Sequence, residues 1–447
     1  MAGWTMAAHP KAVRLVSFDE AREAILSAVS ALPAEPVVLT EALGRVLAED
    51  IVADADLIPY ARSAMDGYAL RAADSDAAKL ERPVRLPVVG KVLAQAGEAS
   101  LAPGTALAIT TGAPVPRGAD AVVPYEQVKR MRDAILLSAP VAMGSSIFPP
   151  AEDVRRGEVL VRRGEVLRPG TLALVAFIGR TEVRAHRRPR VSVLTTGNEL
   201  VDVAATPSHG QVRNSNAFTL TALIAESGGE GLFRGIAPDD RAALGELLRS
   251  ARRSADLLVT TGGASAGERD LVKDVLAELG ADFRFRGVAM RPGKPIGFGT
   301  WDGLPVCVLP GNPAAAFVGF HEFVRPALLG LAGRQPTALP TVPATLRRAV
   351  KSKPGYRYII LAQLELAAEG FAVTPLPNQC SVLVRTAAES NALILLPEGP
   401  LTLEAGSTVE VQVLDWDRVL GPAERVSGSG AADAAATTNL SVLRTHR

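Results

Sequence analysis

The fold is decided by a stretch at 191–200, which reads Val-Ser-Val-Leu-Thr-Thr-Gly-Asn-Glu-Leu. A short apolar run of this kind is typical of a buried strand, and the glycine after it ends the strand. The pattern recurs at 257–263, and a third apolar run at 306–309 leads into Pro-Gly-Asn-Pro at 310–313. Helical patterns and one further strand lie between these runs, at 216–226, 232–236, 240–254 and 271–279, and a last helical pattern follows them at 314–331. This alternation predicts a parallel sheet with helices on both faces over 189–334.

The regions on both sides of this sheet alternate short apolar runs with Gly, Pro and Asp, which is typical of small β domains. One such domain is predicted at 63–150 and a second, barrel-like one at 335–418. Residues 15–62 and 151–188 join the first β domain to the sheet and are predicted to form an α+β linker domain. The predicted fold class is therefore an α/β multidomain protein, with a central parallel sheet flanked by two small β domains.

Three local helices are predicted outside the sheet domain. Ser17-Phe-Asp-Glu20 is a capping box, and the apolar spacing after it predicts a helix over 18–30. Thr40 is a suitable N-cap for a second short helix at 41–47. A third helix is predicted at 171–178.

A direct repeat marks the linker region. Arg-Arg-Gly-Glu-Val-Leu occurs at 155–160 and again at 162–167, and we interpret it as two turn-and-strand units. The tail at 419–447 is rich in Ala, Ser, Gly and Thr, has little to bury, and is predicted to be disordered.

Composition excludes several classes of function. Among 447 residues the formal net charge is +1, so a broad nucleic-acid surface is not expected. The only cysteines, Cys307 and Cys380, cannot build a disulfide framework or a cysteine-rich zinc module. The start of the chain lacks the apolar run of a signal peptide, and the apolar stretch at 313–331 contains His, Glu and Arg. We therefore expect a cytoplasmic protein with no membrane partner.

Unusual loops follow three of the predicted strands. Ligands of open parallel sheets bind beyond the carboxyl ends of the strands, and glycine turns at helix starts expose N–H groups that attract anions. A single loop of this kind is more often a plain strand-to-helix turn, but three at one sheet edge favour an anion site. The candidate binding residues in these loops are Thr196, Gly197, Gly262, Gly263, Ser265, Pro310, Gly311, Asn312 and Pro313.

Charged residues accompany the same loops. Glu199 and Asp270 end two of them, and Asp239 follows another strand. Carboxylates beside a phosphate site suit Mg²⁺, although an Asp at a helix start is equally typical of a cap. Arg291-Pro-Gly-Lys294 places two cations on a stiff loop, where Arg offers a fork for phosphate and Lys a point charge.

Taken together, these motifs resemble those of the molybdopterin molybdenumtransferases, a family similar to the E domain of gephyrin. They occur in family order over about 17–415. The matching stretches lie at 63–69 (Ser-Ala-Met-Asp-Gly-Tyr-Ala), 111–116, 118–123, 195–200, 215–216, 261–267, 290–295 and 309–313.

The resemblance implies an activity and a set of site residues. Molybdate would be inserted into adenylylated molybdopterin while the adenylate is hydrolysed to AMP, with Mg²⁺ as cofactor. Asp66, Thr111, Glu199 and Asp270 would be catalytic, and Glu199, Asp239 and Asp270 would hold the metal. Arg291, Lys294, Pro310 and Pro313 would contact phosphate and pterin, and Ser381 would be the polar residue of a turn in the last β domain.

The resemblance also implies an assembly. The family forms elongated homodimers, in which the linker domain serves dimerisation and each cleft combines one subunit's sheet domain with the other's small β domain. Molybdopterin adenylyltransferase and molybdoenzyme chaperones would be further partners.

The sequence departs from the family pattern at three places. Val159 stands where Asp is usual, the segment Gly355-Tyr-Arg-Tyr358 has only Arg357 as a basic residue, and Cys380 replaces a Gly. Two alternatives stay open: a molybdopterin adenylyltransferase-like enzyme, which would form rather than release the adenylate, and a non-catalytic scaffold paralogue.

Overall fold

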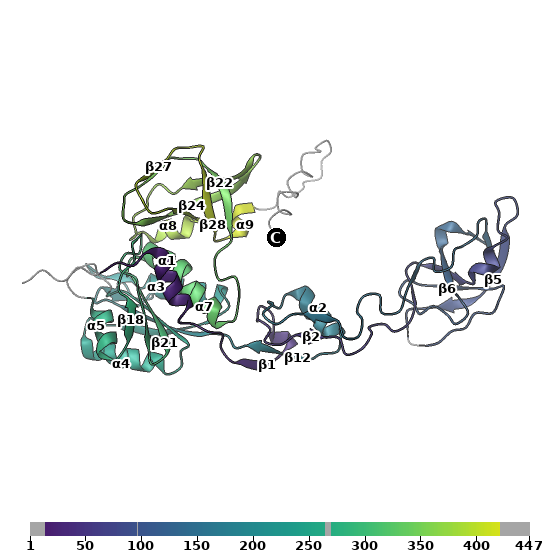
Figure 1. The fold of residues 1–447 in the computed structure, drawn as a ribbon, viewed down its shortest axis with the longest axis horizontal. Helices are drawn as coiled ribbons and strands as arrows, with labels where there is room; N and C mark the ends of the chain where they lie inside the picture. The colour runs from purple at the N-terminus through teal and green to yellow at the C-terminus, as the bar shows by residue number, and fades with distance from the viewer. Residues whose placement is uncertain (1–13, 96, 264–269, 421–447) are drawn as a thin grey trace, which may run out of the picture. The chain divides into compact units, whose positions relative to one another are not determined.

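The structure is a computed structural model that describes residues 14–95, 97–263 and 270–420. The chain forms two compact units, one made of 34–186 and the other of 187–420 together with the N-terminal segment up to Pro33 (Figure 1). The segment before Pro33 thus belongs to the unit that contains the central sheet, whereas the sequence grouped it with the linker.

A six-stranded sheet forms the centre of the larger unit. Four neighbouring strands are parallel, and β20 is antiparallel to both of its neighbours, β21 and β18, so that β18 again runs in the direction of the first four. In spatial order the strands are β16 (Glu230–Ala237), β13 (Arg190–Thr196), β17 (Leu257–Thr261), β21 (Leu304–Leu309), β20 (Gly297–Trp301) and β18 (Asp282–Phe285). The four parallel strands are those predicted from the sequence, and β20 and β18 extend the sheet at this end beyond the prediction. Gly297 and Gly299 interrupt the apolar pattern of β20, because the close approach of β18 leaves no room for a side chain at Gly299.

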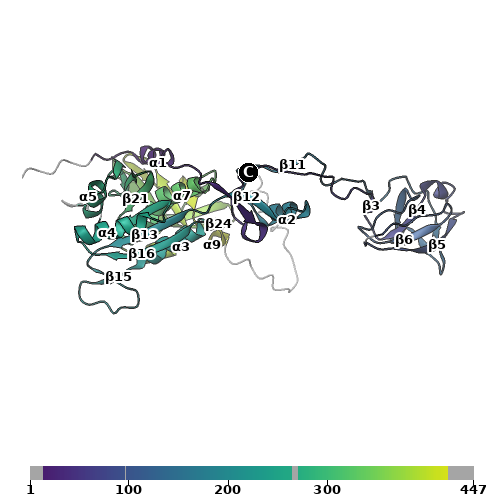
Figure 2. The same ribbon diagram turned by 90° about the horizontal axis from the view of Figure 1, so that it is seen from below.

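Helices cover both faces of this sheet, as the alternation of strands and helices predicted. Alternate residues of the strands, such as Val193 and Leu194, enter different apolar clusters. One cluster contains α1 (Phe18–Leu26), α3 (Ser215–Glu226), α6 (Pro313–Gly319) and α7 (Arg325–Leu331). The other contains α4 (Arg241–Arg252) and α5 (Leu271–Glu278), which lie next to each other in Figures 1 and 2. The Ser17–Glu20 capping box is confirmed at the start of α1.

The apolar stretch Pro313–Leu331 is one continuous helical segment. A π-helical turn, η4 (Phe320–Val324), joins α6 to α7. By length and composition this stretch could cross a membrane, but 83% of its most apolar window is buried within the fold. Its burial between the sheet and α1 explains the apolar composition, because a core helix needs apolar side chains on most of its faces.

The C-terminal β domain belongs to the same unit. Its six-stranded sheet has the order β19 (Met290–Arg291), β24 (Arg357–Ala367), β25 (Gly370–Pro375), β22 (Thr341–Leu346), β28 (Thr408–Val413) and β26 (Ala392–Leu396), with β24 also paired to β26. A separate pair is formed by β23 (Val350–Ser352) and β27 (Leu401–Leu403), and two helices, α8 (Val384–Glu389) and α9 (Trp416–Leu420), complete the domain. The short strand β19 lies in the predicted cationic loop, so this loop is paired directly with the β domain. Helix α9 includes the first two residues of the predicted tail, and the rest of the tail lies outside the described residues.

The smaller unit contains a second β domain. Its six-stranded sheet has the order β7 (Ala121–Pro124), β4 (Gly67–Leu70), β6 (Ala106–Ile109), β5 (Val84–Val92), β9 (Ala134–Leu137) and β8 (Lys129–Arg130). Two-stranded pairs make up the rest, namely β1 (Ala34–Val38) with β12 (Glu182–His186), β2 (Ile51–Val52) with β11 (Val159–Val161), and β3 (Arg62–Ser63) with β10 (Ile147–Phe148). The described part of the unit also holds α2 (Pro169–Phe177) and three 3₁₀ turns, η1 (Leu39–Glu41), η2 (Ala72–Ser75) and η3 (Tyr125–Gln127).

One predicted helix of this unit is wrong. Instead of a helix at 41–47 capped by Thr40, the chain makes a 3₁₀ turn, η1 (Leu39–Glu41), that contains Thr40. Val38 occupies the N-cap position, and its apolar side chain cannot accept a hydrogen bond from the first turn. A longer helix would therefore lack a capping interaction here.

The sequence repeat forms a repeated structure. In the first copy, the N–H of Gly157 donates to the carbonyl of Ala53, and the N–H of Arg156 donates to the carboxylate of Asp56. In the second copy, the N–H of Gly164 donates to the carbonyl of Leu47, and the N–H of Arg163 donates to the carboxylate of Asp50. The glutamate of each copy accepts from the first arginine's N–H, and each glycine has a positive φ. Only glycine adopts that conformation without strain, which explains its place in both copies.

Candidate active site

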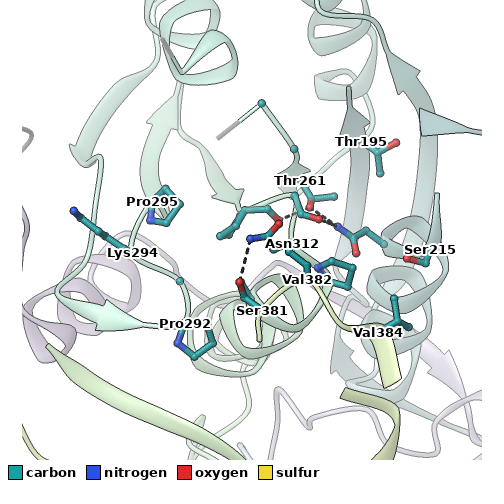
Figure 3. A pocket seen from close by; sticks show the side chains of 18 of the residues that line it. Thr195, Ser215, Thr261, Pro292, Lys294, Pro295, Asn312, Ser381, Val382 and Val384 are labelled. Atoms are coloured by element: carbon teal, nitrogen blue, oxygen red, sulfur yellow. Dashed lines mark hydrogen bonds between the residues drawn. The ribbon is translucent and has the colours of Figure 1, made fainter. Parts of the chain in front are cut away.

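A large pocket lies at the carboxyl ends of β13, β17 and β21. Its volume is about 1340 Å³, and its walls come from the sheet domain and from the C-terminal β domain. Figure 3 shows Lys294, Pro292 and Pro295 on one side of it, Thr195, Ser215 and Val384 on the other, and Asn312 and Ser381 between them. Most of the predicted site residues line this one pocket: Thr196, Glu199, Asp239, Gly262, Gly263, Arg291, Lys294, Pro310, Gly311, Asn312, Pro313 and Ser381.

The glycine turns bring neighbouring strand ends together. Gly262 has a φ of +97°, and a side chain there would collide with the carbonyl oxygen of Thr196. At Gly197 a Cβ atom would lie 2.5 Å from the carboxylate of Glu199. Both loops can therefore run close to the pocket, as their sequence pattern predicted. Ser265 lies outside the described residues.

A hydrogen-bonded network forms the floor of the pocket. The side-chain amide of Asn216 donates to Thr261 Oγ1 at 2.9 Å and to the carbonyl of Gly311 at 2.8 Å. Thr261 Oγ1 donates in turn to the carbonyl of Pro310 at 2.8 Å. Asn216 was not among the predicted site residues, although it belongs to the Ser-Asn motif at 215–216, which could have identified it. Its amide joins the ends of two strands through α3.

One buried hydroxyl of the pocket has no partner. Thr196 is almost completely buried, yet among the residues that the structure describes its Oγ1 atom makes no hydrogen bond. A buried polar group without a partner is costly, so this hydroxyl is suited to a ligand.

Two predicted carboxylates face the pocket from adjacent strands. Asp239 Oδ2 accepts from the N–H of Asn198 at 3.3 Å, and Asn198 Oδ1 accepts from the N–H of Asp239 at 3.0 Å. These bonds tie the loop of Glu199 to the end of β16. The neighbouring Asp240 caps α4 through the N–H of Ala243. The capping role therefore falls to Asp240, and Asp239 remains at the pocket.

Asp270 has a different environment and does not line the pocket. It is the N-cap of α5: Oδ1 accepts from the N–H of Lys273 at 3.1 Å, and Oδ2 lies 2.7 Å from Lys273 Nζ. Burial lowers the pKa of Lys273, while the charge and hydrogen bond of Asp270 act in the opposite direction. Within the described parts of the chain, no three His, Cys, Asp or Glu side chains are grouped as a metal site would require.

The cations of the pocket come from both domains. Arg291 lies over the ring of Tyr356, 4.7 Å from its centroid. Lys294 of the same loop and Lys351 of β23 line the pocket, and neither ammonium has an ion pair among the described residues. Arg357, the basic residue expected from the sequence, does not line the pocket but pairs with Asp19 at 3.0 Å. Lys351 was missed, because a lone lysine in a strand gives no motif.

Ser381 connects the two walls. Its Oγ atom accepts from the amide of Asn312 at 3.1 Å, and its carbonyl accepts from the N–H of Ala314 at 3.0 Å. Asn312 occupies the predicted cap position of α6, but its side chain is used for Ser381 and not for the helix. The turn that contains Cys380, which is exposed, is thereby fixed to the start of α6.

In the smaller unit, Asp66 and Thr111 lie together. Asp66 Oδ1 accepts from the N–H of Thr111 at 2.7 Å and from its hydroxyl at 3.0 Å. These two hydrogen bonds lower the pKa of Asp66, because they stabilise its charged form. The sequence placed both residues in one β domain, and the structure brings them into contact. Val159 is exposed on β11.

A pocket with glycine turns, cations and two carboxylates at the carboxyl edge of a sheet has the features of a domain that binds a phosphate-bearing ligand. Three family models match the chain in order: MoeA N-terminal region (domain I and II) at 16–179, a probable molybdopterin binding domain at 192–330, and MoeA C-terminal region (domain IV) at 343–414. The chain belongs to the MoeA family of molybdopterin molybdenumtransferases, which are transferases of molybdenum cofactor biosynthesis. This confirms the resemblance and the fold class.

Individual relatives support the assignment over nearly the whole chain. A molybdopterin molybdenumtransferase of Staphylococcus aureus is 32% identical over 404 residues, covering 90% of this chain and 96% of that protein. Molybdopterin molybdenumtransferase 2 of Mycobacterium tuberculosis is 37% identical over 389 residues, covering 85% and 94%. The crystal structure of a molybdopterin biosynthesis MoeA protein from Pyrococcus horikoshii has a TM-score of 0.77 and 34% identity, covering 90% of this chain and 100% of that one.

Proposed function

We propose that the chain inserts molybdate into adenylylated molybdopterin, with Mg²⁺-dependent hydrolysis of the adenylate and release of AMP. The observation that carries this proposal is the pocket at the sheet edge, which Arg291, Lys294 and Lys351 all line and where none of the three pairs with a carboxylate of the described residues. A pyrophosphate linkage carries several negative charges and fits such a set of cations.

Backbone and hydroxyl groups complete the phosphate site in this proposal. The loops of Gly262 and Gly311 approach each other, with 3.3 Å between the position of a Gly311 Cβ and the Cα of Gly262. N–H groups in loops of this kind bind phosphate oxygens. The unpaired hydroxyl of Thr196 would donate to the same ligand, which would satisfy the buried group.

Glu199 and Asp239 fit a magnesium ion that is shared with the substrate. Mg²⁺ usually keeps several waters and takes one or two carboxylates together with substrate phosphates, so two carboxylates facing the phosphate pocket suffice. The bound ion would neutralise phosphate charge. The residues of this chain then hold the substrate: the cations bind its phosphates, and the Asn198–Asp239 bonds fix the loop that carries Glu199.

Molybdate would be the second substrate of this reaction. It is a tetrahedral oxyanion, and the polar seam between the two walls offers Ser381 and the cation Lys351 to such a group. The walls belong to different domains, so an anion bound between them contacts both.

We further propose that the enzyme is a cytoplasmic homodimer in which Asp66 and Thr111 are supplied by the small β domain of a second copy of the chain. Asp66 is exposed, and within its own unit its carboxylate is held ready by the two hydrogen bonds from Thr111. Molybdopterin adenylyltransferase and molybdoenzyme chaperones remain proposed partners.

The test is conversion of adenylylated molybdopterin by the purified protein with molybdate and Mg²⁺. We expect AMP release that depends on molybdate and is lost in EDTA, together with active molybdenum cofactor measured by reconstitution of an apo-molybdoenzyme. Formation of adenylylated molybdopterin from molybdopterin and ATP would favour the adenylyltransferase alternative. Binding of the substrate without turnover would favour a scaffold and contradict the proposed activity.

A further inference from the structure

Lys273 is a lysine enclosed by the sheet domain. Its side chain is only 3% exposed, although it carries a charged ammonium group. Nζ lies 2.7 Å from Asp270 Oδ2, 2.6 Å from the carbonyl of Pro295 and 3.1 Å from the carbonyl of Arg286. Nζ thus donates hydrogen bonds to the two carbonyls and forms an ion pair with Asp270, whose Oδ2 atom accepts no hydrogen bond among the described residues.

The three oxygens belong to segments that bound the phosphate pocket. Arg286 and Pro295 enclose the segment that carries Arg291 and Lys294, so the ammonium binds the carbonyls at both of its ends. Asp270 begins α5, which follows the glycine loop of β17. One buried side chain therefore joins the cationic loop to the loop at the carboxyl edge of the sheet.

The surrounding packing is shaped for this side chain. A Cβ atom at Gly297 would lie 2.6 Å from Lys273 Cε, so the glycine leaves the space that the lysine stem fills. The bond from the N–H of Val288 to the carbonyl of Lys294 closes the cationic loop between the two anchored ends. Asp270 contacts Lys273 with both oxygens: Oδ1 accepts a hydrogen bond from its N–H, and Oδ2 forms an ion pair with its ammonium.

We propose that Lys273 and Asp270 form a positioning pair that holds Arg291 and Lys294 in the geometry required to bind the substrate pyrophosphate. This inference rests on the proposed function, because it assigns the cationic loop to that substrate.

The experiment measures binding of inorganic pyrophosphate to the full-length protein by calorimetry in EDTA, so that no metal takes part. Asp270→Asn removes a negative charge, which by simple electrostatics would strengthen anion binding. If the carboxylate positions the loop, binding should instead weaken about tenfold, in line with the 10–100-fold cost of losing a group that orients a binding residue. Lys273→Met should weaken binding similarly, and the double variant should be no worse than either single one.

Several controls separate positioning from general damage. Asp274→Asn alters a carboxylate of the same helix that pairs with Arg286 at the surface, and it should bind pyrophosphate normally. Lys273→Arg should recover part of the affinity. If Lys273→Met does not fold, Gly297→Ala displaces the lysine stem and should reproduce the weaker binding.

The outcomes distinguish this inference from the proposed function. Unchanged or tighter pyrophosphate binding by Asp270→Asn overturns the positioning role, even if the wild type releases AMP normally. Fully additive losses in the double variant overturn it as well, as does a wild type that binds no pyrophosphate. Failure of the wild type to release AMP, with the predicted binding pattern intact, refutes the proposed reaction and leaves the positioning pair supported.

Discussion

The small β domain and the sheet domain present their polar groups in opposite electrostatic settings. Asp66 already accepts two hydrogen bonds from Thr111, so its charge is stabilised within its own domain. At the sheet edge, in contrast, Lys294 and Lys351 face the pocket without an ion pair in the described structure, and the hydroxyl of Thr196 is unpaired. The difference favours the proposal that the sheet domain binds the ligand and that the small β domain supplies a carboxylate whose charge is already stabilised.

The largest effect is expected for Glu199 in the pocket of the sheet domain. Glu199→Gln should lower the rate of AMP release by at least about a hundredfold, because it removes a charge placed beside the phosphates. Glu230→Gln is the matched control: Glu230 lies on the same sheet and pairs with Arg190. Near-normal turnover of Glu199→Gln, measured with saturating substrate, would remove Glu199 from the site.

A second prediction tests whether Asp66 of the small β domain and Glu199 of the sheet domain act in one cleft. Asp66→Ala and Glu199→Ala should each be inactive, but mixing the two chains should restore activity. With random exchange half of the dimers are mixed and have one intact cleft, so about a quarter of wild-type activity should return. Exchange is verified with differently tagged chains, and an exchanged mixture that stays inactive would contradict a cleft shared between subunits.

A third prediction sharpens the role of the unpaired cations. Lys351→Met should raise the KM for adenylylated molybdopterin by about tenfold with a smaller change in kcat, because it removes a charge that binds the substrate anion. Lys353→Met is the control, since Lys353 is two residues away and does not line the pocket. Equal KM values for the two variants would show that the pocket does not use Lys351.

The smallest effect concerns the hydrogen bonds of Asp66. These bonds lower its pKa, so the carboxylate remains ionised further into the acid range. Thr111→Val removes the hydroxyl bond but keeps the N–H bond, and the pKa of Asp66 should rise. The acid limb of the pH–kcat profile should therefore move to higher pH. An acid limb that stays in place would show that ionisation of Asp66 does not control the rate.

The sequence predicted those parts of the site that are encoded by consecutive residues. The Thr-Thr-Gly loops and the Pro-Gly-Asn-Pro turn could be assigned because apolar runs and glycines lie next to each other in the chain, and the structure places them around one pocket. The sequence did not predict β18 and β20. Gly297 and Gly299 interrupt the apolar run of β20, and the close packing that requires them cannot be recognised from the sequence pattern.

Contacts between distant segments could not be predicted in the same way. Lys273 looks like an ordinary helix lysine, since two of its three acceptors are backbone carbonyls, which have no sequence signature. Arg357 and Lys351 show the same difficulty. Arg357 lies in the segment 355–358 that the family pattern marked as basic, but it pairs with Asp19, whereas Lys351 lies outside that segment and lines the pocket. Side-chain direction depends on tertiary packing, and a motif alone does not determine it.

The repeated Arg-Arg-Gly-Glu-Val-Leu segment has a consequence for how the smaller unit reaches its native state. Both copies form the same set of bonds, with Ala53 and Asp56 for the first and Leu47 and Asp50 for the second. A refolding chain that pairs the second copy with the first copy's partners would form locally equivalent bonds in the wrong register. The two registers differ in packing, because Leu167 of the second copy is completely buried while Leu160 of the first is only partly buried, so burial and not the repeated bonds selects the native register.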